Sequence, residues 1–154
     1  MLGYWKNEEE TNKVLKNGWL YTGDIGKFEG EFLKITDRKK DIIITPGGDN
    51  ISPIKIENDL NKSDFIEQSL VYGDNKSYLV CLIVLSSAYK NIQKEKIQEE
   101  IDKININLPK IEKIKKFIVI NSQFKIENGM MTPTLKLKRY KIIKNYKMEL
   151  EKLF

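Results

Sequence analysis

The chain has 154 residues, about the length of one globular domain and fewer than a large two-substrate enzyme usually needs. Its residues are 40% hydrophobic and 32% charged, which is typical of a folded domain rather than of a disordered segment. Because the chain contains no His, it cannot carry out Ser-His or Cys-His catalysis. Cys81 is the only cysteine, so no disulfide or cysteine-rich metal site can form within the chain.

The charge balance is positive, with 27 Lys and Arg against 22 Asp and Glu and a net charge of +5. Such a balance suits phosphate-bearing ligands. The lysines are nevertheless spread along the whole chain and interleaved with glutamates, so we expect a solvated surface and no nucleic-acid binding. No apolar run approaches the roughly 20 residues that span a bilayer, and residues 1–20 do not resemble a signal peptide. We expect an intracellular protein, in the cytoplasm or on the cytoplasmic face of a membrane.

The first predicted element is a short amphipathic helix that follows a loop within residues 3–17. Thr11 and Asn12 are the expected capping residues of this helix, because their side chains can accept from free backbone N–H groups. Asn17-Gly18 is expected to end it.

Short antiparallel strands are predicted next, at residues 19–22 and 32–36, with a turn at residues 29–31. Residues 37–41, Asp-Arg-Lys-Lys-Asp, form a wholly charged interruption before a second β-type run at residues 42–45. This interruption is the best candidate boundary in the chain. We therefore predict that one domain ends at residue 36 and a second begins at residue 37.

The second part begins with a tight loop at residues 46–50 and a helix for which Ser52 is the cap and Pro53 the first residue. Ile56 and Leu60 are expected on the buried face of this helix. Alternation and apolar runs then predict two strands around the turn at residues 73–76, followed by a further helix, a buried strand and a final helix. Their residues are 65–72 and 78–85 for the two strands, Ile97, Ile101, Ile104 and Leu108 for the helix, 117–120 for the last strand, and Ile143, Tyr146, Leu150 and Leu153 for the final helix.

Strands and helices mix without regular alternation, so the predicted fold class is α+β. The expected architecture is a small domain with a mixed or antiparallel sheet flanked by helices, preceded by a short β-rich segment. Cys81 lies in the apolar strand at residues 78–85, where we expect a buried and inert thiol.

Tyr21-Thr22-Gly23-Asp24 places a carboxylate directly after a glycine, where a chain can turn and present an acceptor outward. A carboxylate in that position can accept from both hydroxyls of a ribose. A Gly-Asp pair by itself is more often an ordinary turn.

Three segments together point to a family: GWLYTGDIG, then ITDRKKDIIITPGGDNISPIKIE, and near the end MTPTLKLKR. In order and spacing they resemble the adenylate-forming superfamily of acyl-CoA synthetases, peptide-synthetase adenylation domains and firefly-type luciferases. The double glycine of the second segment and the PTLKLKR of the third look like the long-chain fatty acyl-CoA synthetases, whereas the other branches usually have Ser-Gly-Lys in the third. By this resemblance, residues 1–36 are the end of the large AMP-binding N-terminal domain and residues 37–154 the mobile C-terminal domain.

The resemblance implies roles for individual residues. Asp24 matches the aspartate that binds the ribose hydroxyls, within a nucleotide-binding segment that includes Tyr21 and Thr22, and Arg38 matches an arginine that also contacts the nucleotide. Lys136 matches the lysine that stabilises negative charge on the carboxylate and α-phosphate during adenylation. The glycine that usually precedes this lysine is Leu135 here, which leaves open whether Lys136 or Lys138 points into the site.

Lys40 matches the hinge about which the C-terminal domain swings between an adenylation pose and a thioester-forming pose. Gly47 and Gly48 match a loop near the path of the CoA pantetheine in the second pose. For either glycine alone, a plain turn explains the residue equally well. Asp49 replaces the glutamate common in similar sequences, so no contact is assigned to it.

The implied reaction joins a fatty acid to CoA through an acyl-adenylate, with ATP as the second substrate and AMP and pyrophosphate as products. The phosphate loop, the acyl pocket and the glutamate that binds Mg²⁺ would all lie upstream of this sequence, so no metal ligand is expected here. The chain's partner would be its own N-terminal domain, any membrane association would come from the missing region, and the chain alone should be inactive or nearly so. Two alternatives are an adenylate-forming enzyme that loads a carrier protein and a basic binding module.

Overall fold

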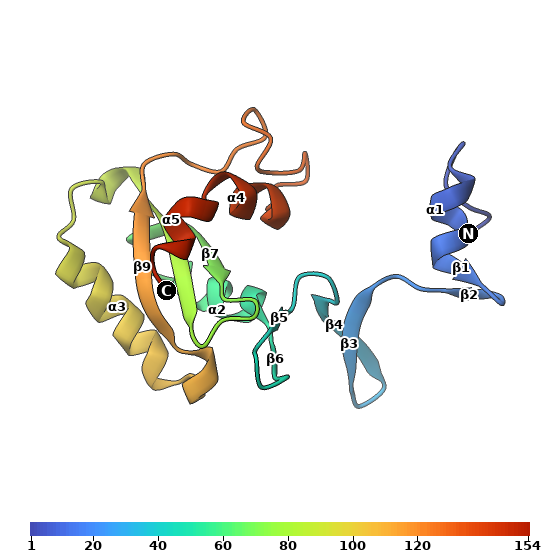
Figure 1. The fold of residues 1–154 in the computed structure, drawn as a ribbon, viewed down its shortest axis with the longest axis horizontal. Coiled ribbons are helices and arrows are strands. Elements are labelled where there is room, and N and C mark those ends of the chain that lie inside the picture. The colour runs from blue at the N-terminus through green and yellow to red at the C-terminus, as the bar shows by residue number, and fades with distance from the viewer. The chain divides into compact units, whose positions relative to one another are not determined.

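The structure, a computed structural model, describes all 154 residues. The chain divides into two compact units, Met1–Asp41 and Ile42–Phe154, which are described separately (Figure 1). The division lies C-terminal to the predicted one after residue 36, because β4 (Phe32–Arg38) continues through Asp37 and Arg38. The charged run at residues 37–41 therefore does not interrupt the strand where the sequence suggested.

The N-terminal unit begins with helix α1 (Glu8–Val14). The cap is Asn7, whose side-chain oxygen accepts from the N–H of Glu10 at 3.1 Å. The prediction of Thr11 and Asn12 as caps was wrong, since both lie inside the helix, and the Thr11 hydroxyl donates back to the Asn7 carbonyl at 2.7 Å. Three glutamates in the first turn favour this start, because carboxylates stabilise the positive end of a helix.

Two hairpins complete this unit. β1 (Leu15–Lys16) and β2 (Trp19–Leu20) pair across Asn17-Gly18, both of which have positive φ, as a tight hairpin turn requires. Asn17-Gly18 is thus a hairpin turn rather than the direct stop of the helix, which ends at Val14. β3 (Asp24–Glu29) pairs antiparallel with β4, and the predicted turn around Gly30 joins them.

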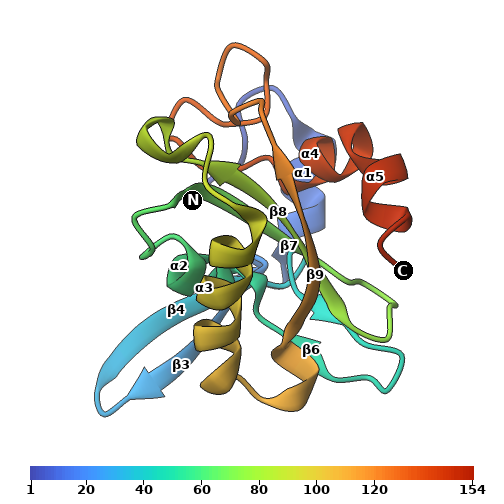
Figure 2. The same ribbon diagram turned by 90° about the vertical axis from the view of Figure 1, so that its left-hand side faces the viewer.

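The C-terminal unit is built on a three-stranded sheet in the order β7-β8-β9 (Figure 2). β7 (Ile66–Tyr72) and β8 (Leu79–Leu85) are antiparallel, as the two apolar runs around residues 73–76 predicted. β9 (Ile114–Ile120) is parallel to β8 and begins earlier than the predicted residues 117–120. β8 is buried along its whole length, so the sheet is covered on both faces.

Helices α2 (Pro53–Leu60) and α3 (Lys94–Ile106) cover one face of the sheet, where alternate residues of β8 share a core with Ile56, Leu60, Ile97 and Ile101. The predicted cap is confirmed: the Ser52 hydroxyl accepts from the N–H of Lys55 at 3.3 Å, and Pro53 is the first helical residue. Short 3-10 turns at Ser87–Tyr89 and Lys110–Glu112 flank α3.

The other face is covered by α4 (Arg139–Asn145) and α5 (Lys147–Glu151) (Figure 1). The single final helix that was predicted is therefore divided at Tyr146, whose ψ of 21° departs from helical geometry. The predicted apolar stripe packs on this face, but Ile142, which was not predicted, is one of its two fully buried members, together with Leu150.

A small hairpin, β5 (Ile43–Ile44) with β6 (Asn50–Ile51), precedes α2. It is tied to the turn between β7 and β8, because the Asp74 carboxylate accepts from the N–H of Ile44 at 3.1 Å and the N–H of Asn75 donates to the Ile44 carbonyl at 2.9 Å. The mixed sheet with helices on both faces confirms the α+β prediction. No helix combines the length and apolarity needed to cross a bilayer.

The end of the chain is fastened to the sheet. Glu151 accepts from Lys76 at 2.6 Å and from the Tyr72 hydroxyl at 3.0 Å, and the Tyr78 hydroxyl donates to the Leu153 carbonyl at 2.6 Å. Burial, together with the hydrogen bond to Glu151, raises the pKa of Tyr72 to about 12. These contacts fix α5 in place although only Leu150 of that helix is fully buried.

Candidate functional site

The β3–β4 hairpin brings Asp24 and Arg38 together. The two residues are register partners, and the Arg38 Nε lies 2.9 Å from Asp24 Oδ1. Asp24 opens β3 rather than closing the preceding segment, and its own N–H donates to the Thr22 hydroxyl at 3.1 Å. Gly23 precedes it at φ +74°, and its carbonyl accepts from the N–H of Lys39 at 2.8 Å. The carboxylate is therefore held by both its backbone and its partner.

The Asp24 carboxylate can still accept hydrogen bonds from a ligand in this arrangement. Asp24 is one-quarter exposed, at 25% of the side chain, and Arg38 is half exposed, at 53%. The ion pair engages Oδ1, whereas Oδ2 makes no hydrogen bond within the chain. An oriented carboxylate with a free oxygen beside a guanidinium can accept from hydroxyls while the guanidinium donates to neighbouring oxygens. Tyr21 is exposed, and its N–H donates to the Val14 carbonyl at 2.7 Å.

Lys40 lies in a turn in which the N–H of Asp41 donates to the Arg38 carbonyl at 2.9 Å. Its side chain is exposed, and it immediately precedes the last residue of the N-terminal unit. The residue predicted as a hinge is thus solvated and adjacent to the division between the two units. Its role as a hinge stays a prediction.

Gly47 and Gly48 lie in the exposed loop between β5 and β6. The loop is closed by Thr45 and Asp49: the N–H of Thr45 donates to the Asp49 carbonyl at 3.0 Å, and the Thr45 hydroxyl donates to the Asp49 carboxylate at 3.0 Å. Gly48 has φ +87°, a conformation that a residue with a side chain rarely adopts. Asp49, to which no role was assigned, is thus a structural residue of this loop.

Lys136 lies on a further hairpin, residues 130–138, which belongs to the segment between β9 and α4. The hairpin is closed by the N–H of Thr132, which donates to the Lys136 carbonyl at 2.8 Å, and by the N–H of Lys138, which donates to the Met130 carbonyl at 2.8 Å. The N–H of Lys136 donates to the Thr132 hydroxyl at 3.0 Å. Both lysine side chains are exposed, but Lys136 lies near the tip, whereas Lys138 is the cap residue of α4.

Leu135 has φ +59°, in the left-handed region, and its side chain is exposed. This conformation explains physically why a glycine is usual at this position in similar sequences, since only glycine adopts it without steric cost. In this chain Leu135 adopts the conformation with a side chain present, at the residue directly before Lys136.

Two contacts that sequence reasoning missed hold the segment that carries Lys136. At its start, the Gln68 amide of β7 accepts from the N–H of Phe124 at 2.7 Å and donates to the Phe124 carbonyl at 2.9 Å. At its end, Arg139 forms a buried ion pair with Glu57 of α2, with Nη1 2.6 Å from Oε1. One feature of the sequence could have indicated this ion pair. Glu57 is a charged residue directly after Ile56, on the buried side of α2. A buried carboxylate needs a charged or hydrogen-bonding partner.

The predicted residues thus form two groups within their own units. Asp24, Arg38 and Thr22 meet in the N-terminal unit. In the C-terminal unit, the Lys136 hairpin and the Gly47-Gly48 loop lie at opposite ends of the sheet in both views (Figures 1 and 2). The two loops are thus separate features of one unit.

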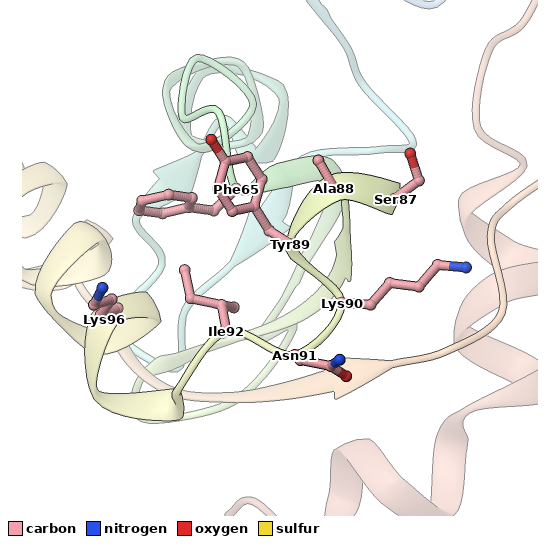
Figure 3. A pocket seen from close by; sticks show the side chains of 8 residues that line it. All are labelled: Phe65, Ser87, Ala88, Tyr89, Lys90, Asn91, Ile92 and Lys96. Carbon is pink, nitrogen blue, oxygen red and sulfur yellow. The ribbon is translucent and has the colours of Figure 1, made fainter.

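A surface pocket elsewhere in the C-terminal unit contains none of these residues (Figure 3). Its walls include Phe65 and Tyr89, whose rings meet edge-on with centroids 4.9 Å apart, and Ile92. No group of His, Cys, Asp or Glu side chains in the chain is arranged to hold a metal ion.

Known proteins resemble this chain over nearly its whole length. It is 35% identical over 176 residues to long-chain-fatty-acid–CoA ligase 5 of Mus musculus, a match that covers 99% of this chain and 26% of the mouse protein. It is 30% identical over 174 residues to long-chain-fatty-acid–CoA ligase FadD15 of Mycobacterium tuberculosis, covering 99% of this chain and 29% of that protein. The chain thus spans less than a third of the length of these relatives.

Solved structures are also similar to this chain over nearly its whole length. The adenylation domain of a carboxylate reductase from Mycobacterium chelonae superimposes with a TM-score of 0.88 at 29% identity, over 98% of this chain and 25% of that one. The A domain of the carboxylic acid reductase from Segniliparus rugosus, in complex with AMP and a co-purified carboxylic acid, has a TM-score of 0.86 at 28% identity, over 98% of this chain and 26% of that one. The A-PCP didomain of the same enzyme with AMP gives the same TM-score and identity, over 98% of this chain and 23% of that one.

A family model described as the AMP-binding enzyme C-terminal domain matches residues 40–154. The match begins at Lys40 and therefore covers the whole C-terminal unit, including both the Gly47-Gly48 loop and the Lys136 hairpin. The resemblance drawn from three sequence segments is thereby confirmed, and the chain belongs to the AMP-binding enzyme C-terminal domain family of the adenylate-forming superfamily.

Proposed function

We propose that this chain is the C-terminal part of an ATP-dependent fatty acyl-CoA synthetase. The observation that carries the proposal is the exposed Lys136 hairpin, in a chain that matches fatty-acid–CoA ligases over 99% of its length. The hairpin is closed by its own backbone hydrogen bonds, so it presents an ammonium group on an ordered support. A cation on such a support suits a reaction that develops negative charge on phosphoryl oxygens.

In the first step, a fatty acid carboxylate oxygen attacks the α-phosphorus of ATP, and the bond to pyrophosphate breaks. Lys136 would stabilise the negative charge shared by the carboxylate and the α-phosphate. Asp24 would accept from the ribose hydroxyls through the oxygen that Arg38 leaves free, and Arg38 would donate to the nucleotide. Residues of this chain thus fit a nucleotide, while Mg²⁺ would be held by ligands outside it.

In the second step, the CoA thiol attacks the acyl carbon, its proton is lost to the solvent, and AMP leaves. The Gly47-Gly48 loop would line the path of the pantetheine. Because this loop and the Lys136 hairpin lie at opposite ends of one unit, rotation about Lys40 would exchange one for the other at the reaction centre. The exposed turn at Lys40 offers a solvated point for this rotation.

The proposal is tested on the complete protein that contains this chain. We expect fatty-acid-dependent release of pyrophosphate from MgATP, followed by formation of acyl-CoA when CoA is added. The 154-residue chain alone should give neither, because it carries no phosphate loop. Release of pyrophosphate that does not depend on a fatty acid, or robust acyl-CoA formation by the chain alone, would contradict the proposal.

A second candidate is an adenylate-forming enzyme that loads a carrier protein. The observation in its favour is the similarity to an A-PCP didomain at a TM-score of 0.86. The same assay separates the two functions when CoA and a phosphopantetheinylated carrier protein are offered as competing acceptors. We expect the acyl group on CoA, and exclusive transfer to the carrier protein would favour the second candidate.

A further inference from the structure

The edge of the sheet at β7 is completed by side chains. β7 pairs with β8 on one side only, so backbone groups on its other edge need partners from elsewhere. At Val71 the N–H donates to Glu57 Oε1 at 2.6 Å, and the carbonyl accepts from Arg139 Nη2 at 2.6 Å. Arg139 Nη1 also donates to Glu57 Oε1 at 2.6 Å and Oε2 at 2.9 Å. Glu57 and Arg139 thus take the place of a neighbouring strand.

The hydrogen-bond geometry at Val71 suits the carboxylate of Glu57 and the guanidinium of Arg139 in particular. The side chains are 10% exposed for Arg139 and 8% for Glu57, so each charge is removed from water and depends on the other. The planar guanidinium serves the carboxylate with one nitrogen and the Val71 carbonyl with the other, which a lysine ammonium cannot do in the same fixed geometry. The pair therefore determines the position of the Arg139 backbone relative to β7.

That position matters because Arg139 directly follows the Lys136 hairpin. The N–H of Lys138 is bonded to the Met130 carbonyl, so the two arms of the hairpin meet next to Arg139. Gln68, also on β7, holds Phe124 at the other end of the same segment. The loop that carries Lys136 is thus fixed at both ends to one strand.

We propose that Glu57 and Arg139 are positioning residues that hold the base of the Lys136 hairpin against β7 and so set the place of the Lys136 ammonium during adenylation. The inference rests on the proposed function for its catalytic part. Its structural part, the anchoring of the hairpin, stands on the contacts alone. A misplacement of about 1 Å can cost an enzyme about a hundredfold in rate, so an anchor outside the reaction centre can be essential.

The structural part is tested by amide hydrogen exchange in the 154-residue chain. In Arg139→Lys and Glu57→Gln, we expect the amides of Thr132 and Lys138, which close the hairpin, to exchange about tenfold faster, while amides of the central strand β8 keep their protection. Asp59→Asn is the matched control, because it removes a partly exposed carboxylate from the same helix as Glu57. Unchanged hairpin exchange in both variants would overturn the anchoring.

The catalytic part is tested in the complete enzyme with the same variants, at a temperature where circular dichroism shows each to be folded. We expect acyl-adenylate formation to fall about 10- to 100-fold and thioester formation from preformed acyl-adenylate to change less than about twofold. In a Lys136→Ala background, Glu57→Gln should cause no further loss of adenylation, because residues that act as a unit are not additive.

Equal loss in both half-reactions, or full additivity with Lys136→Ala, would show that the pair contributes only to folding and would overturn its positioning role. If Lys136→Ala by itself leaves adenylation intact, the proposed function fails and the catalytic part of the inference falls with it. The exchange measurement still decides the anchoring in that case. Should Arg139→Lys fail to fold, Glu57→Gln, which keeps the shape of the side chain, carries both tests.

Discussion

Removal of the Arg139 guanidinium should destabilise the C-terminal unit far more than removal of a surface charge. In Arg139→Met, the Glu57 carboxylate keeps the N–H of Val71 but loses both hydrogen bonds from the guanidinium, and the Val71 carbonyl loses its side-chain donor. Breaking a buried ion pair by removing one partner costs about 3–5 kcal/mol, because the remaining charge stays buried after its counter-charge has gone. For a unit of this size, that loss lowers the melting temperature by about 10–20 °C.

The comparison variant is Lys62→Met, which removes an exposed lysine just beyond the end of α2 that pairs with the partly exposed Asp59 at an N–O distance of 2.7 Å. Exposed pairs contribute about 0–1 kcal/mol, so this variant should melt within a few degrees of the parent chain. Thermal and urea unfolding followed by circular dichroism give both values under the same conditions. If Arg139→Met loses no more free energy of unfolding than Lys62→Met, the buried pair does not have the role that the contacts assign to it.

Three further predictions concern other parts of the chain. Leu135→Gly should change the free energy of unfolding by less than about 1 kcal/mol, whereas Leu135→Val should lower it by about 1 kcal/mol or more, since a β-branched residue tolerates φ +59° worst; urea unfolding of both variants checks this. Burial raises the pKa of the Cys81 thiol, so a thiol reagent should label it only on unfolding, and labelling of the folded chain at neutral pH would contradict its burial. The hydrogen bond from Lys76 holds the pKa of Glu151 below its ordinary value. The stabilising effect of the ionised Glu151 carboxylate is therefore fully present above the ordinary carboxyl pKa and is lost as the pH falls through the lowered pKa. Glu151→Gln should accordingly destabilise the chain at pH 7 and have no effect in strong acid. Unfolding curves at both pH values check this.

The elements that the sequence predicted well are those with a strong local period. β7 and β8 followed from apolar runs on either side of a turn, and α2 from Ser52-Pro53 with Ile56 and Leu60 at helical spacing. Predicted element boundaries were wrong where pairing with a distant segment determines the structure. β4 continues through the charged residues Asp37 and Arg38 because it pairs with β3, and the pairing overrides the local composition.

The candidate site was predictable only in part. The three sequence segments predicted Asp24, Arg38 and Lys136 as site residues, and the structure added that the first two form an ion pair. The Glu57–Arg139 pair could not be predicted from spacing, since it joins residues 82 positions apart through the edge of a third element. The position of Glu57 indicated only that it needs a partner, because a charge on the buried side of a helix must be compensated.

Lys136 is proposed to serve adenylation and to leave the thioester step to other groups. The direct measurement is Lys136→Ala in the complete enzyme, with acyl-adenylate formation and thioester formation from preformed acyl-adenylate followed separately, and with Lys138→Ala as the matched control. We predict that Lys136→Ala lowers adenylation by about 100-fold or more and leaves thioester formation nearly unchanged, while Lys138→Ala leaves both nearly unchanged. Equal loss in both half-reactions of Lys136→Ala, or loss of adenylation only in Lys138→Ala, would contradict the account.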